Sequence, residues 1–342
     1  MNNPSYKKNF LILSVLGIVS FFLNISLGSV MIPIQDIIAV LFGKNASKES
    51  WEIIVLNFRI PKAITAVMVG SGLSVSGLLM QTLFRNPLAG PFVLGISSGA
   101  SLGVAFLLLS ASLFGGFLAS SAITHWTLPI AASLGAFLVL SAVIFAANSV
   151  RNTMSILIIG LMFGSFASAI INVLSYFSEA TQLQQFLFWS FGSLGNLSWN
   201  ELLVFGIFYT VGMCAIFSII KPLNSLLLGE NYAKSLGIQI QKSRNIILLI
   251  TSLLTGVITA FSGPIAFVGL AVPHLARLFF GTSNHKTLLP ATALIGAIVL
   301  LICDVIAQLP TSEYTLPINA ITSLFGAPIV IWLLIRKKKL VV

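Results

Sequence analysis

The sequence predicts an all-α, polytopic membrane protein with about ten transmembrane helices and both termini in the cytoplasm. Of the 342 residues, 57% are hydrophobic and only 8% are charged, and the mean hydropathy is +1.04. Water-soluble domains carry about a quarter charged residues, so this composition excludes them. The net charge of +10 does not indicate nucleic-acid binding, because the basic residues stand singly among apolar runs and form no dense basic face.

The helices are predicted from apolar stretches, since a membrane-spanning helix needs about 20 mostly apolar residues. We expect them at 10–29, 62–82, 93–110, 128–147, 154–176, 199–219, 245–261, 264–280, 287–308 and 318–335. A transmembrane β-barrel would instead show short segments of alternating hydrophobicity, which do not appear.

The positions of the basic residues predict the orientation, because cytoplasmic ends and loops are enriched in lysine and arginine. With the N-terminus inside, 14 of the 18 basic residues face the cytoplasm, and the outward four are Lys44, Lys48, Arg59 and Lys62. The inward basic residues are Lys7, Lys8, Arg85, Arg151, Lys221, Lys234, Lys242, Arg244, Arg277, Lys286, Arg336, Lys337, Lys338 and Lys339. The net positive charge is therefore a topology signal.

We expect residues 1–342 to form a single transmembrane domain with two loops longer than a turn. The outer loop covers 30–61, and the inner loop covers 220–244. Within the inner loop, Leu226 to Gly237 predicts a short amphipathic helix that stops at a glycine. Such a helix suggests a surface that another protein grips, although an ordinary helix lying in the membrane interface has the same pattern.

The sequence lacks the common nucleotide-binding and metal-binding motifs. GxxxxGK[ST], HExxH and CxxC are all absent, so we expect neither nucleotide hydrolysis nor a metal site in this chain. Two ionisable residues within apolar segments, His274 and Asp304, are functional candidates by default. Alternatively, His274 satisfies a carbonyl freed by Pro273, and Asp304 caps a helix or pairs with a polar neighbour. A proton-coupled secondary transporter using His274 and Asp304 is the alternative function, and a membrane enzyme would have only these two residues to use.

Six stretches, taken in order, resemble one family over nearly the whole chain. They are Arg59–Gly72, Arg85–Ala89, Leu94–Ala100, Gly229–Gly237, Gly269–His274 and Leu324–Pro328. The chain closely resembles the permease subunits of ABC importers for ferric siderophores, haem and cobalamin.

The resemblance implies a permease that moves an iron chelate across the bacterial inner membrane by alternating access. A ferric siderophore is the expected cargo, with haem or cobalamin as further possibilities. The implied partners are a second copy of the chain or a homologous permease, cytoplasmic ATPase subunits, an extracytoplasmic substrate-binding protein and membrane lipid. ATP and magnesium belong to the ATPase, so no cofactor is expected in this chain, which is not itself an enzyme.

The resemblance also implies roles for single positions. The residues expected to couple to the ATPase are Gly229, Glu230, Ala233, Leu236 and Gly237. Arg59 and Lys62 would dock acidic residues of the binding protein, although Gln308 stands where a third basic residue is often found. Thr153 and Met154 are the expected cytoplasmic gate.

The translocation path must pass a bulky chelate without retaining it, so weakly interacting side chains suit it better than histidine or carboxylate ligands. The segment 154–176 offers such uncharged residues, namely Gly164, Ser165, Ser168 and Asn172. The lack of charge in this segment argues against a bare-ion channel and against a proton-coupled carrier.

Overall fold

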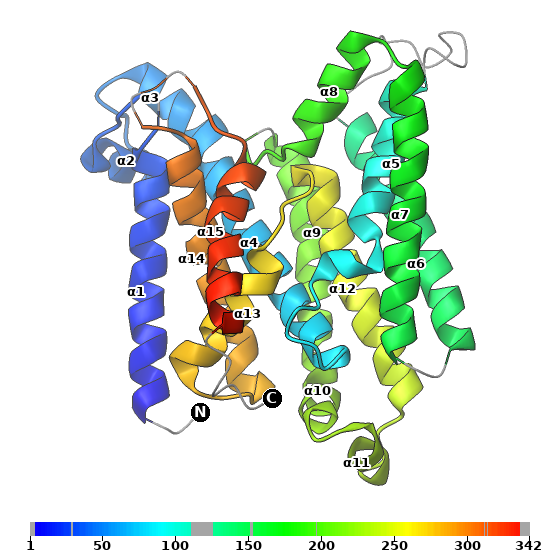
Figure 1. Ribbon diagram of the computed structural model, residues 1–342. Coiled ribbons are helices and arrows are strands. Elements are labelled where there is room, and N and C mark those ends of the chain that lie inside the picture. The colour runs from blue at the N-terminus through cyan, green and yellow to red at the C-terminus, as the bar shows by residue number, and fades with distance from the viewer. Residues whose placement is uncertain are drawn as a thin grey trace. The chain divides into compact units, whose positions relative to one another are not determined.

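The structure is a computed structural model that describes residues 4–28, 30–110, 126–150, 153–195, 197–310, 312 and 314–335, and their regular structure is helical throughout (Figure 1). In chain order the helices are α1 (Pro4–Ser26), α2 (Ile34–Leu41), α3 (Glu49–Ile54), a π-helix (Val55–Arg59), α4 (Ile60–Leu83), a 3-10 helix (Pro91–Leu94), α5 (Ile96–Leu109), α6 (Thr127–Ser149), α7 (Thr153–Phe177), α8 (Ala180–Ser190), α9 (Trp199–Ala215), a 3-10 helix (Ile216–Ile219), α10 (Ile220–Leu227), α11 (Glu230–Ser235), α12 (Ile240–Ser262), α13 (Val268–Phe280), α14 (His285–Ala307) and α15 (Ile318–Ile335).

Each of the ten predicted segments coincides with an apolar helix, which confirms the all-α polytopic fold. Seven described helices are long and apolar enough to cross a membrane, and shorter apolar helices lie at the other three positions. The segment predicted to begin at residue 264 begins instead at Val268, so that boundary was wrong. Gly263 and Phe267 both have positive φ, which an α-helix does not accommodate.

Both long loops contain more helix than we predicted. The outer stretch 30–61 holds α2, α3 and the π-helix, and α8 was not predicted at all. The single amphipathic helix expected from Leu226 was also wrong, because α10 ends at Leu227 and α11 begins at Glu230. Gly229 separates them with φ +106, a conformation that glycine adopts readily and other residues rarely do.

The chain groups into two compact units. Unit 1 comprises Met1–Val75, Ser193–Gly206 and Ile265–Lys339, and unit 2 comprises Ser76–Gly192, Ile207–Pro264 and Leu340–Val342. The division falls within α4 and α9. The expectation of a single domain stays a prediction.

Unit 1 is organised around α14, which packs against α1, α13 and α15. It also meets α4 at a point where two glycines face each other. A Cβ atom on Gly70 would lie 2.8 Å from the carbonyl carbon of Gly296 and 2.8 Å from Cβ of Leu300. Only a residue without a side chain allows α4 and α14 to approach this closely.

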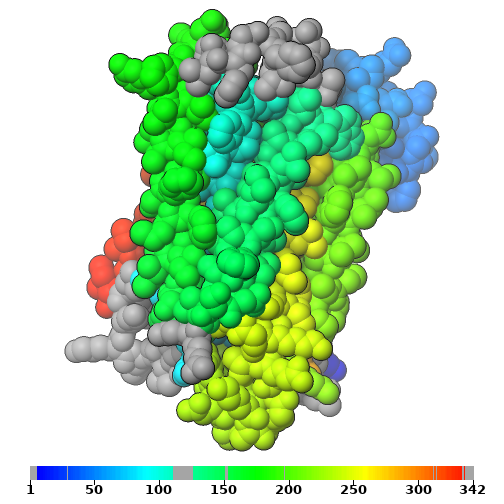
Figure 2. Space-filling model, turned by 90° about the vertical axis from the view of Figure 1, so that its right-hand side faces the viewer, coloured from blue at the N-terminus to red at the C-terminus, as the bar shows by residue number. Residues whose placement is uncertain are grey.

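Unit 2 is organised around the short helix α5, which packs against α6, α7, α8 and α12. Small residues allow this packing, since a Cβ atom on Gly99 would lie 2.6 Å from the carbonyl oxygen of Gly135. In contrast, most of α7 is left exposed by the described residues, and Figure 2 shows α6 and α7 side by side.

Two of the cations expected to be cytoplasmic lie at one end of unit 1. In unit 1, Lys7 and Lys8 lie in the first turns of α1, beside the end of α13, where Asn9 donates a hydrogen bond to the carbonyl of Phe279 (3.2 Å). Figure 1 shows that α1 begins and α15 ends at this end of the unit. Among the cations expected to be cytoplasmic, Arg151, Arg336, Lys337, Lys338 and Lys339 lie outside the described residues.

Candidate functional site

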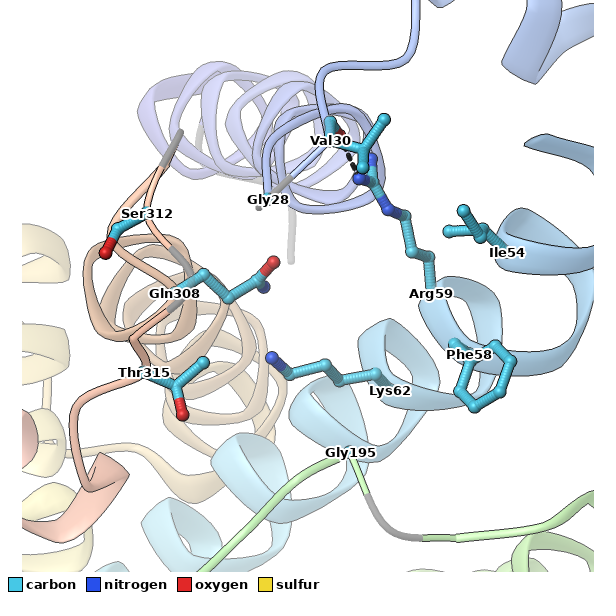
Figure 3. Close-up of a pocket in the computed structure, with 10 residues that line it drawn as sticks. All are labelled: Gly28, Val30, Ile54, Phe58, Arg59, Lys62, Gly195, Gln308, Ser312 and Thr315. Carbon is cyan, nitrogen blue, oxygen red and sulfur yellow. Dashed lines mark hydrogen bonds between the residues drawn. The ribbon is translucent and has the colours of Figure 1, made fainter. Parts of the chain in front are cut away.

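A pocket of about 350 Å³ lies in unit 1, at the end of α14 where that helix finishes (Figure 3). Its wall includes both predicted docking residues. The lining consists of Gly28, Val30, Ile54, Phe58, Arg59, Lys62, Gly195, Gln308, Ser312 and Thr315. The structure thus brings together Arg59, Lys62 and Gln308.

Arg59 is buried and its guanidinium is used inside the unit. Its Nη1 donates to the carbonyl oxygens of Ile25 (2.5 Å) and Ser26 (2.7 Å), and its Nη2 donates to that of Val30. The carbonyls at a helix C-terminus lack helical partners and carry partial negative charge, so a cation there is stabilising. Arg59 therefore caps α1. The π-helix that ends at this residue places it there, as π-turns often do for functional side chains.

Lys62 crosses the pocket and forms an ion pair with Asp304 of α14, with 3.1 Å between Nζ and Oδ1. The other carboxylate oxygen of Asp304, Oδ2, accepts hydrogen bonds from Asn24 (2.8 Å) and Gln308 (2.7 Å). The Lys62 side chain is 22% exposed and that of Asp304 only 3%, so the carboxylate is buried and its charge is compensated. Of the two interpretations of Asp304, pairing with polar neighbours is confirmed.

The predicted coupling residues lie together in α11 and in the turns at its two ends. Ala233 is 0% exposed and faces inward, whereas Tyr232 and Leu236 are 51% and 55% exposed and form the outer face of α11. Gly237 has φ +80, and no described atom lies within 4 Å of where its Cβ atom would stand, so its conformation rather than its size requires glycine. The surface available to another protein therefore centres on Tyr232 and Leu236. Ala233 is buried within unit 2.

The predicted gate residues begin α7, and one of them contacts the coupling region. The Thr153 hydroxyl donates to Glu230 Oε1 of α11 (2.9 Å), and Met154 is exposed beside it. Nothing in the sequence links these two positions, which lie 77 residues apart.

The predicted path residues lie on the uncovered side of α7. Ser165, Ser168 and Asn172 are exposed, at spacings of three and four residues that place them on one helical face. The two serine hydroxyls donate to carbonyls of their own helix, those of Leu161 (3.1 Å) and Gly164 (3.0 Å). Gly164 is partly covered because Ser98 of α5 lies beside it. These three polar residues lie among exposed apolar side chains, such as Leu161 and Met162, and α7 carries no charged residue.

The comparison with known families decides the identity of the chain. Residues 15–336 match the FecCD transport family. The chain belongs to the FecCD transport family. It is a transmembrane permease of the ABC importer type.

Relatives of this FecCD permease are similar over most of their length. It is 36% identical over 333 residues to the uncharacterized ABC transporter permease protein YvrB of Bacillus subtilis, covering 94% of this chain and 91% of the relative. It is 36% identical over 290 residues to the vitamin B12 import system permease protein BtuC of Salmonella typhi, covering 84% and 85%.

Among solved structures, an inward-facing metal-chelate type ABC transporter superposes with a TM-score of 0.83 at 29% identity, covering 96% of this chain and 99% of that one. PsaBC from Streptococcus pneumoniae shares the fold alone, with a TM-score of 0.53 at 16% identity, covering 82% of this chain and 92% of that one. Together these matches confirm the expected family and the polytopic fold of this permease.

The remaining ionisable candidate, His274, is buried in α13 directly after Pro273. Among the described residues of this FecCD permease, no three His, Cys, Asp or Glu side chains lie together as metal ligands would. The roles of the single site residues stay predictions.

Sequence reasoning missed the neighbours that decide how the site residues work. Asn24 was not a candidate, and Asp304 was considered without its partner Lys62. Tyr232 was overlooked because the family pattern of small residues drew attention to Ala233. Tyr232 and Leu236 stand four residues apart, with only small or polar residues between them. This spacing could have indicated that they share one face of α11.

Proposed function

We propose that this permease imports an iron chelate by alternating access, powered by ATP hydrolysis in a separate subunit, across the inner membrane of a bacterium with both termini inside. The observation that carries the proposal is the exposed apolar face of α11, formed by Tyr232 and Leu236, in a chain of the ABC importer type. Exposed apolar side chains among cytoplasmic charges are typical of a surface that binds another protein. The occupant we assign to it is the ATPase.

The cargo proposal rests on chemistry as well as on similarity. One relative is named for vitamin B12 import and one solved structure for a metal chelate. An uncharged α7 face with Ser165, Ser168 and Asn172 offers weak polar contacts and no strong ligand. A ferric siderophore is the cargo we propose, with haem or cobalamin as outcomes of the same uptake assay.

Two further partners complete the proposal. A second copy of the chain, or a homologous permease, would cover the open side of α7, so that the path runs between two subunits. The pocket beside Lys62 would receive an acidic side chain of an extracytoplasmic binding protein, and such pairs mainly raise the rate and specificity of association. Both cations have partners inside the unit, but Arg59 is 8% exposed whereas the Lys62 side chain is 22% exposed, so Lys62 is the one that we expect to make this contact directly.

The test of the function is uptake by proteoliposomes that contain the permease, its ATPase and its binding protein. We expect labelled ferric siderophore to accumulate only when ATP is present on the ATPase side, and accumulation to cease when the binding protein is left out. A protonophore should leave the initial rate unchanged. Uptake that continues without ATP and collapses with the protonophore would instead support a proton-coupled transporter using His274 and Asp304.

The surface of α11 gives a sharper prediction for the ATPase contact. Tyr232→Asp should weaken binding of the ATPase to the detergent-solubilised permease at least about tenfold, because buried tyrosines are among the residues that dominate interface affinity. Asn231→Asp is the matched control, since it adds the same charge at the exposed neighbouring position and should change affinity by less than about threefold. Equal effects of the two substitutions, measured by surface plasmon resonance, would place the ATPase elsewhere.

A further inference from the structure

A hydrogen bond between Thr153 and Glu230 joins the predicted cytoplasmic gate to the predicted coupling helix, both in unit 2. Thr153 is the first residue of α7, where the predicted gate lies, and Glu230 is the first residue of α11, the predicted coupling helix. The distance from the threonine Oγ1 to the glutamate Oε1 is 2.9 Å. Hydrogen bonds to a charged acceptor are stronger than neutral ones, so this bond is suited to transmit force.

The helix α11 has an exposed side, which a partner protein could push, and a buried side, which packs within unit 2. Tyr232 and Leu236 face outward, whereas Ala233 is fully buried against the unit. The turn at Gly229 closes over Arg85, whose Nη1 would lie 3.7 Å from a Cβ atom at that position. A helix of this length, held at a tight turn, moves as one body, and Glu230 moves with it.

The other end of the α6–α7 connection is attached to a different helix. Arg244 of α12 donates from Nη2 to the carbonyls of Ala147 (2.6 Å) and Val150 (3.2 Å), at the end of α6. Gln241 and Asn245 both donate to the Asn148 side chain, each at 3.0 Å. The end of α6 is therefore fixed to α12, and the start of α7 is bonded to α11.

Because the two attachments differ, the start of α7 is the end of the α6–α7 connection that would move with α11. Four hydrogen bonds from three side chains hold the end of α6 on the long helix α12. The start of α7 is bonded to a six-residue helix that presents its other side to solvent. A displacement of α11 would therefore shift α7 relative to α6. The Glu230 carboxylate also attracts the guanidinium of Arg244.

We propose that Glu230 is a positioning residue that transmits the displacement of α11 to the first turn of α7 through the hydroxyl of Thr153. The inference rests on the proposed function, because it requires an ATPase that moves α11. It assigns to Glu230 a contact inside the permease, where the family resemblance suggested only a contact with the ATPase. A purely structural bond would stabilise unit 2 without affecting how ATP hydrolysis is coupled to transport.

The test compares Thr153→Val, Glu230→Ala and the double variant in proteoliposomes containing the ATPase, measuring ferric siderophore uptake and ATP hydrolysis together. We expect Thr153→Val to hydrolyse ATP within about twofold of the wild-type rate, and each single variant to move about five- to tenfold less cargo per ATP, as loss of one charge-assisted hydrogen bond predicts. The double variant should be no worse than Glu230→Ala, because the bond that Thr153→Val removes is already absent there. Thr153→Ser keeps the hydroxyl and should restore coupling.

The matched control is Thr251→Val in α12 of the same unit. Its hydroxyl is buried and has no hydrogen-bond partner among the described residues, so the same change of side chain should leave the cargo-to-ATP ratio unchanged. A normal ratio in Thr153→Val, or effects that multiply in the double variant, would overturn the inference. So would a fall in thermal stability of Thr153→Val accompanied by equal losses of hydrolysis and uptake. Wild-type protein that shows no ATP-driven uptake would overturn the proposed function together with this inference, whereas a coupled wild type with unaffected variants would overturn the inference alone.

Discussion

Gly70→Leu is expected to destabilise the permease by more than about 3 kcal/mol and to prevent most of it from folding. Even the Cβ atom of the new side chain would lie 2.8 Å from the carbonyl carbon of Gly296 and closer still to its oxygen. These are backbone atoms of α14, so the clash is relieved only if α4 and α14 separate. The energy lost exceeds the roughly 1 kcal/mol that a better helix former than glycine would gain. The measurement is the thermal unfolding midpoint in detergent, together with the yield of monodisperse protein.

The matched control for this prediction is Gly17→Ala in α1, which also packs on α14. A Cβ atom there would lie 3.7 Å from Cγ1 of Ile298, which is an ordinary van der Waals contact. The control should therefore be as stable as the wild type. If Gly70→Leu unfolds at the wild-type temperature, the close approach of α4 and α14 is not present in the membrane protein.

Asp304→Asn should destabilise the permease by about 3 kcal/mol, because it leaves the Lys62 ammonium without its buried counter-charge. The substitution retains the shape of the side chain but replaces one carboxylate oxygen by an NH2 group. Both oxygens of Asp304 accept from donors, namely Lys62, Asn24 and Gln308, so the NH2 group would face a donor in either orientation. The loss of the ion pair at 3.1 Å and the crowding of donors act in the same direction. Thermal unfolding in detergent at low and high salt gives the measurement, and salt should change the difference little for a buried pair.

Two controls separate the ion pair from a general effect of charge. Glu49→Gln removes an exposed carboxylate from the same unit and should change stability by less than about 0.5 kcal/mol. The double variant Lys62→Met with Asp304→Asn removes both charges and keeps most of the lysine's apolar length, so it should recover much of the lost stability. If the double variant is less stable than Asp304→Asn, the pair between Lys62 and Asp304 does not account for the effect.

Most of the fold could be predicted because membrane-spanning helices are specified locally. About 20 apolar residues in a row give the same result whatever surrounds them, so the ten segments coincide with apolar helices. The failures lie where the chain leaves the regular helix. The break at Gly229 and the late start at Val268 both depend on positive φ values. At Phe267 the sequence gives no sign of a positive φ, because the residue is not a glycine.

The candidate site was predictable only in part. The resemblance led to Arg59, Lys62, Thr153 and Glu230, and the structure places them in two clusters, one in each unit. It also changes what they do locally, since Arg59 caps α1 and Ala233 faces inward. A family pattern shows that a residue type is favoured at a position and does not identify the atoms it contacts.

The sequence by itself determined the class of protein, the number of apolar helices, the expected orientation and the family, because composition, apolar length and motif order are properties of the chain alone. Only the tertiary structure decided which charges are compensated and which surfaces are open. Asn24 and Asp304 are 280 positions apart, and Thr153 and Glu230 are 77 apart. No local pattern encodes such pairs, because they arise when packed helices bring distant side chains within hydrogen-bonding distance in an environment where an unpaired polar group is costly.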